Sequence, residues 1–198
     1  MAKPQWVTTQ PSSGSMNGTV NISGSKHTGR NQRSGKLTFK ADGATDVERP
    51  VNQAGRTEFV TVSDVSAPKG GGNVTITGKS NSSKLNFALG AGDITVTLPE
   101  SYSAGGATTT NNMAIAGDPG AGAEFEFSMT LAIPKNTTIA NKSRKITITA
   151  AGGQTATATI SQAAGDPTLS VTPATVTLDA EGTAVAVTVT SNTNWTVE

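Results

Sequence analysis

Residues 124–133 read EFEFSMTLAI, and polar and apolar side chains alternate along almost the whole stretch. A period of two is typical of a β-strand, because successive side chains point to opposite faces of a sheet. The alternation predicts that Phe125 and Phe127 face a core while Glu124 and Glu126 face water. Two carboxylates on one strand face could instead hold Ca²⁺ or act as an acid/base pair.

The same period runs through the rest of the chain, and no apolar stripe with the 3.6-residue period of a helix accompanies it. Clusters rich in glycine, such as Gly70–Gly72 and Gly152–Gly153, separate the short alternating stretches. Short strands with this punctuation are typical of antiparallel β-sandwiches. The sequence therefore predicts an all-β protein with strands at 19–23, 36–40, 56–62, 73–77, 93–98, 124–133, 145–150, 155–162, 174–179 and 184–190.

The composition excludes several function classes. The 198 residues include 15 Lys+Arg, 14 Asp+Glu, one histidine and no cysteine, which leaves a net charge of +1. Without cysteine there is no disulfide framework, thiol nucleophile or thiolate metal site, and near-neutrality gives no reason to expect nucleic acid or an anionic membrane. The first residues lack the apolar run of a secretory signal, so we expect a protein that works without export or one whose leader was trimmed.

An internal repeat organises the chain. Residues 19–55 (TVNI…RSGKLTF…VNQAG) resemble residues 130–165 (TLAI…RKITIT…ISQAAG), with Arg33 matched to Arg144. Residues 74–77 (VTIT) likewise resemble residues 187–190 (VTVT). We interpret residues 1–60 as the back half of a sandwich, 61–164 as a complete sandwich with a long 98–122 loop, and 165–198 as a front half.

The two terminal halves also carry opposite charge. Residues 1–60 hold eight basic and four acidic side chains, and residues 165–198 hold four acidic and no basic ones. Opposite signs favour association of these segments. The halves could close within one chain, be exchanged between subunits, or belong to a longer repeat array. Sandwiches strung end to end would place the halves farther apart than the linker 163–167 can span, about 17 Å, which favours exchange and a homo-oligomer.

Both terminal halves contain short motifs: LSVTP (169–173), VTVTSN (187–192), NWTV (194–197), PSSG (11–14), the Arg33 strand, and the ending QAG (53–55), which the intact copy matches with QAAG (162–165). These motifs resemble the BACON domain, an immunoglobulin-like β-sandwich of Bacteroidota and their phages. The resemblance implies two immunoglobulin-like sandwiches, one of them split between the termini, and the intact copy departs from it with Leu85 where the other has Trp195. Proteins of this type include proposed carbohydrate-binding modules and virion proteins such as the capsid-decorating proteins of crAss-like phages.

Nothing in the sequence assembles a catalytic or cofactor site. The only histidine, His27, has no evident nucleophile or orienting acid, and Gly117–Gly122 lacks the Lys-Ser/Thr of a phosphate loop. We therefore expect a non-enzymatic protein without metal or cofactor. The leading hypothesis is a structural virion protein that decorates a capsid and is assembled in the host cytoplasm, with the major capsid protein or other virion proteins as partners. The alternative is a glycan- or mucin-binding module of a secreted Bacteroidota protein.

A few residues stand out as candidate contacts. The 98–122 segment is much longer than its counterpart in the split copy, so we expect a contact loop there, with Tyr102, Asn111 and Asn112 as binding candidates. Tyr102 is the one aromatic residue that the pattern places in a loop, where a sugar could stack on it. The remaining candidates are the basic residues Lys26, Arg30 and Arg33, which form either a solvated face or a docking surface for an acidic partner, and Trp6 and Trp195, which should be buried where the two halves meet.

Overall fold

The computed structural model describes residues 3–198 and confirms an all-β protein. Within these residues the only helical element is one 3-10 turn, η1 (Pro119–Ala121), and no helix could cross a membrane. The middle of the chain forms two sheets, ordered β10-β9-β11-β7-β5 and β6-β13-β12-β8. Their strands are β5 (Val60–Val62), β6 (Val65–Ala67), β7 (Gly72–Ser80), β8 (Leu85–Gly92), β9 (Ser101–Ala104), β10 (Ala107–Thr110), β11 (Phe125–Ile133), β12 (Lys142–Ala150) and β13 (Thr155–Gln162).

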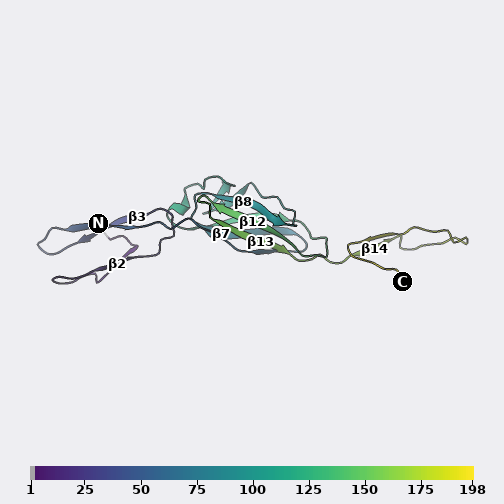
Figure 1. The fold of residues 1–198 in the computed structure, drawn as a ribbon, viewed down its shortest axis with the longest axis horizontal. Coiled ribbons are helices and arrows are strands. Elements are labelled where there is room, and N and C mark those ends of the chain that lie inside the picture. Colours follow the sequence, from purple (N-terminus) through teal and green to yellow (C-terminus); the bar gives the residue numbers. More distant parts are fainter. Residues whose placement is uncertain (1–2) are drawn as a thin grey trace.

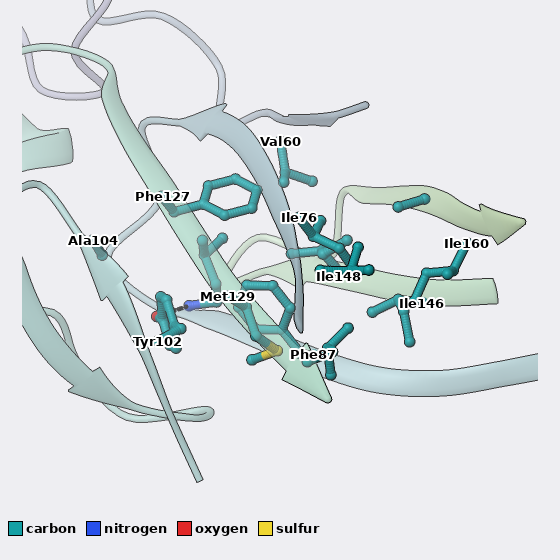
Figure 2. Packing of buried hydrophobic residues seen from close by; sticks show 14 of the residues in the cluster. Val60, Ile76, Phe87, Tyr102, Ala104, Phe127, Met129, Ile146, Ile148 and Ile160 are labelled. Atoms are coloured by element: carbon teal, nitrogen blue, oxygen red, sulfur yellow. Dashed lines mark hydrogen bonds between the residues drawn. The ribbon is translucent and has the colours of Figure 1, made fainter. Parts of the chain in front are cut away.

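The core lies between these two sheets, and β11 shows how the sequence builds it. Every second residue of β11, from Phe125 to Ile133, is buried, as the alternation predicts. Figure 2 shows Phe127 and Met129 of β11 with Ile146 and Ile148 of the opposite sheet. Glu124 and Glu126 point outward, where Lys79 Nζ lies 3.9 and 3.7 Å from their carboxylates. These two carboxylates therefore face a cation of the protein on the sheet surface.

The two ends of the chain form hairpins that extend away from this sandwich. We call residues 3–56 the N-arm and residues 166–198 the C-arm. The N-arm holds β1 (Val7–Gln10) paired with β2 (Asn21–Gly24) and β3 (Arg33–Phe39) paired with β4 (Val47–Gln53), and the C-arm holds β14 (Leu169–Thr172) paired with β15 (Thr188–Ser191). The arms leave the sandwich at opposite ends (Figure 1), and within residues 3–198 no sheet contains strands of both.

The segment 98–122, predicted to be one long loop, is instead built around a β-hairpin. β9 and β10 pair with each other, and β9 adds to the edge of the first sheet, with Phe127 opposite Ala104. The small residues Ser, Ala, Gly and Thr hide the alternation here, so the pattern gave no strand signal. The predicted strand at 93–98 is wrong in the other direction, because these residues are not in a strand although Ile94 is buried.

Candidate interaction surfaces on the two arms

A buried asparagine fastens the N-arm to the central sandwich. Asn81 is fully buried, and its Oδ1 accepts a hydrogen bond from Phe59 N at 3.0 Å. Its amide nitrogen donates to Thr28 O at 3.2 Å and Arg56 O at 3.3 Å, both in the N-arm. The single side chain therefore connects the start of the sandwich to the two N-arm segments that meet it.

The joint between the sandwich and the C-arm repeats this arrangement. Asn192 Oδ1 accepts from Thr168 N at 2.8 Å, and its amide nitrogen donates to Thr137 O at 3.0 Å and Asp166 O at 2.9 Å. Asn192 thus relates the C-arm to the central sandwich as Asn81 relates the sandwich to the N-arm. Positions equivalent in the two joints, such as Thr28 and Thr137, are 109 residues apart.

The shift of 109 holds from residue 25 to residue 56. It places Arg33, which is opposite Gln53, at the position of Lys142, which is opposite Gln162. The sequence match of Arg33 to Arg144 is therefore wrong by two positions, because both residues carry a guanidinium next to similar strands. Three more hydrogen-bonded pairs share the shift: Arg56–Gly29 with Gly165–Thr138, Gln53–Ser25 with Gln162–Pro134, and His27–Asn31 with Asn136–Ala140.

In the C-arm, positions that are buried in the central sandwich are exposed. Val60 is 8% exposed, and its counterpart Leu169 is 60% exposed. Ser80 and Ser191 make equivalent hydrogen bonds to Phe59 O and Thr168 O, which gives a shift of 111 for the second strand. With this shift, fully buried Ile76 corresponds to Val187, which is 43% exposed. Large exposed side chains of the C-arm are Leu169, Val171, Val176, Leu178, Val185, Val187, Trp195 and Val197.

The N-arm shows the same contrast. Leu131 is 1% exposed and its counterpart Ile22 is 47% exposed, while Ile148 is fully buried and its counterpart Phe39 is 40% exposed. Leu37 and Val7 are exceptions on this face, because both are buried within the arm. The C-arm therefore presents one sheet face with the pattern of a sandwich core and without the opposite sheet. The N-arm holds parts of two sheets, whose core-facing positions are only partly covered.

Three residues of the basic run in the N-arm, Arg30, Lys36 and Lys40, meet acidic groups of the same chain. Arg30 pairs with Asp118 of the 98–122 segment, which raises the pKa of Arg30, and Glu58 lies 3.9 Å away. The Arg33 guanidinium lies over the Trp6 ring, 4.6 Å from its centroid. Lys26 is exposed. The acids missing from the sequence around this run are thus supplied by other segments, two of them from the β3–β4 hairpin: Glu48 for Lys36 and Asp46 for Lys40.

The binding candidates of the 98–122 segment have structural contacts. Tyr102 does not lie in a loop as predicted: it is on β9, 3% exposed, and its hydroxyl accepts a hydrogen bond from Leu85 N at 3.2 Å (Figure 2). Burial raises the pKa of Tyr102. Asn111 exchanges hydrogen bonds with the Phe87 backbone at 2.9 and 3.0 Å, and Asn112 is exposed with a φ of 61°. The buried Tyr102 ring offers no open face to a sugar.

The two tryptophans lie on different arms. Trp195 on the C-arm is 51% exposed, and Trp6 on the N-arm is half-buried. Because the arms extend in opposite directions, the expected packing between these rings is not made within one chain (Figure 1). His27 Nε2 lies 2.7 Å from Asn31 O, a contact that holds the turn at the base of the N-arm.

Comparisons with known proteins add little to this description. No protein-family description and no curated protein matches the chain. Among solved structures, it is similar to the endo-fucoidan hydrolase MfFcnA9 of glycoside hydrolase family 107, with a TM-score of 0.30 and 12% identity over 82% of this chain and 26% of that one. A second endo-fucoidan hydrolase of that family, MfFcnA4, gives a TM-score of 0.27 and 12% identity over 83% and 23%. The chain thus spans about a quarter of the length of these structures.

Proposed function

We propose that this protein is a non-enzymatic structural subunit that assembles by completing its terminal half-sandwiches with those of other subunits. The observation that carries the proposal is the pair of exposed core faces at opposite ends of the chain. A two- or three-stranded sheet with one bare apolar face is marginal in water. Exposed apolar patches flanked by polar residues mark interaction sites. Completion of each half by its complement removes both the bare face and the open strand edges.

The strand order supports an immunoglobulin-like sandwich as the repeated unit. β9-β11-β7-β5 forms one sheet and β13-β12-β8 the core of the other. In chain order these strands follow the D-E-B-A and G-F-C arrangement of immunoglobulin domains. With that assignment, the N-arm supplies strands D to G, and the C-arm supplies strands A and B with the start of C.

For the setting of this assembly we propose a virion, in which the protein decorates a capsid or a related particle surface of a Bacteroidota phage. Support comes from the resemblance of its motifs to domains found in such particles and from the exposed core-pattern positions at both ends of the chain. On this proposal the chain is assembled in the host cytoplasm, with the major capsid protein or another virion protein beneath it.

Two measurements test the proposal. Light scattering and native mass spectrometry on the full chain over a range of concentrations should show species larger than a monomer. A chain that stays monomeric and cooperatively folded at all concentrations would contradict the structural role. For the setting, peptide mass spectrometry of purified particles should detect this chain in proportion to the capsid protein, and its absence from such particles would remove the virion assignment.

Glycan binding is the alternative, and one surface of the central sandwich bears on it. A shallow open depression of about 620 Å³ lies over β5, β7 and β11, lined by polar groups that include Lys79, Glu126 and Ser103. Hydroxyls and charges can hydrogen-bond a sugar, but no aromatic ring lies open on this surface for stacking. A glycan array with the monomeric fraction of the protein separates the two roles.

A further inference from the structure

We infer that two copies of this chain join head to tail in one defined strand register, with residues 183–191 of one copy beside residues 16–24 of the next, and that this joining continues as an open filament. These two segments include β15 and β2, respectively. The inference rests on the proposed assembly function and specifies the partner and its geometry. Its basis is that the central sandwich contains a front half and a back half packed on each other. The contacts between these two halves serve as a template for the contacts between the C-arm of one copy and the N-arm of the next.

The free edge of β2 corresponds to the edge of β11 that β7 occupies. In the central sandwich, Glu126 O accepts from Gly105 N, so even-numbered residues of β11 direct their backbone groups toward β9. Ser25 corresponds to Pro134 by the shift of 109, and Ser25 N donates to Trp6 O, next to β1. Since backbone groups alternate between the two edges of a strand, β1 occupies the β9 side of β2. The β7 side of β2 is therefore unpaired.

The register on that side follows from the template. β7 and β11 pair antiparallel over nine residue pairs, with Ile76 opposite Met129. The shifts of 111 and 109 convert this pair to Val187 and Val20. Val187 of one copy should therefore lie opposite Val20 of the next, and both side chains, exposed at 43% and 36% in the single chain, would enter a common core.

A matching turn fixes the other end of the C-arm. Gly71 has a φ of 82° and its N donates to Pro68 O at 2.9 Å, while Gly182 has a φ of 75° and its N donates to Asp179 O at 3.2 Å. A glycine suits both positions because other residues adopt positive φ at a cost. Pro68 thus corresponds to Asp179, and the turn at 179–182 is the C-arm copy of the turn at 68–71.

In the central sandwich, the turn at 68–71 faces the back half of the domain. The equivalent contact between two copies, made by the turn at 179–182, would bring opposite charges together. Gly71 packs against the backbone of Lys135, at 2.7 Å from the position of a Cβ. Lys135 corresponds to Lys26, so the turn with Asp179 and Glu181 should lie beside Lys26 of the next copy. An exposed lysine of the positive N-arm would then meet the acidic residues of the negative C-arm, which fixes the orientation of the pair.

The joints explain why growth is open. Asn81 and Asn192 make the same set of hydrogen bonds, so each sandwich is placed on its neighbour by nearly the same rotation. Contact between the front of one copy and the back of another is heterologous, and such contacts give filaments when the rotation does not close a ring. The arms leave the sandwich at opposite ends, so each added copy lengthens the assembly (Figure 1).

Cysteine cross-linking tests the register, since the natural chain has no cysteine. Thr75 Oγ1 and Thr130 Oγ1 lie 3.0 Å apart on the solvent face of the template. Their counterparts are Ala186 and Asn21, both exposed and both outside the core. The full-length variant carrying Asn21→Cys and Ala186→Cys should form disulfides between copies on oxidation, because directly opposite residues have the short Cβ separation that a disulfide needs.

A matched control carries Asn21→Cys with Thr188→Cys, which the register places two residues away on the same face, about 7–8 Å diagonally. We expect a ladder of covalent multimers on a non-reducing gel from the first variant and at least tenfold less from the control. Equal cross-linking of both variants, or a disulfide within one chain, would overturn the register. Cross-linked products of one fixed size would overturn the open filament. Light scattering of the unmodified chain reports separately on the proposed function, because assembly without the expected disulfide contradicts only this inference.

Discussion

Two substitutions on opposite arms should each stop assembly, and the two variant chains should form a dimer when they are mixed. Val187→Asp places a carboxylate on the C-arm face, and Ile22→Asp places one on the N-arm face. Each variant keeps one intact face. A Val187→Asp chain can therefore still offer its N-arm to the intact C-arm of an Ile22→Asp chain, and the resulting pair has no competent end left.

The magnitude follows from burial in the template. Ile76 is fully buried at the position where Val187 is 43% exposed, so assembly removes the remaining exposed part of the valine from water. Full burial of such a side chain is worth about 1.5–3 kcal/mol, which gives about 1 kcal/mol here. A carboxylate in the same place adds several kcal/mol of desolvation cost. A total of about 4 kcal/mol corresponds to a roughly thousandfold weaker association.

Sedimentation velocity measures the result directly. We expect the wild-type chain to form large species, each variant alone to sediment as a monomer, and the equimolar mixture to form a dimer and nothing larger. Val176→Asp should act like Val187→Asp and serves as a second C-arm variant. If the mixture stays monomeric while each variant keeps the circular dichroism and melting temperature of a folded sandwich, the two faces are not complementary.

Four further substitutions and a change of pH probe the joints and the core. Asn81→Ala should lower the unfolding free energy by about 2 kcal/mol, since it leaves a buried N–H without a partner, whereas Asn192→Ala on the exposed joint should cost less than half of that in the same thermal melts. Lys69 holds the pKa of Asp166 below its usual 3.8, so the contact between these two side chains stabilises the second joint above about pH 4 and is lost as pH falls through the lowered pKa. Amide hydrogen exchange at Thr168 should therefore accelerate at that low pH. In the Asp166→Asn variant, exchange at Thr168 should be fast at neutral pH as well. Tyr102→Phe should lower the stability of the central sandwich by about 1–3 kcal/mol, because the Leu85 N–H then has no acceptor, and an unchanged melting temperature would contradict the role of that hydrogen bond.

The strands that the sequence predicted best are those with large, strictly alternating residues. The prediction 155–162 coincides with β13, and 124–133 differs from β11 by one residue. The predicted strand 174–179 and the first part of 184–190 do not form strands in the structure. In the proposed assembly, these segments would become strands when another half-sandwich supplies a partner. The hydrophobic pattern of a segment indicates which of its side chains can be buried in a sheet. The segment forms a paired strand only where a neighbouring strand is present.

The candidate interaction surfaces could be predicted only in part from the sequence. The repeat, the opposite charges and the division into halves were visible as short motifs. Tyr102 was misplaced because an edge hairpin of small residues carries no periodic signal, so its burial was hidden. Asn81 and Asn192 were missed as joint residues, although both follow a serine at the end of a strand, and that repeated Ser-Asn pair was the signal available.

By itself, the sequence determined that the chain is all-β and that its ends resemble complementary parts of the central sandwich, because side-chain alternation and repeated motifs are local properties. Only the tertiary structure decided that the ends extend away from each other and which residues correspond, with shifts of 109 and 111. The reason is that direction is set at the joints by a few hydrogen bonds between residues far apart in sequence. Such bonds leave no period in the sequence, yet they determine where each exposed face points.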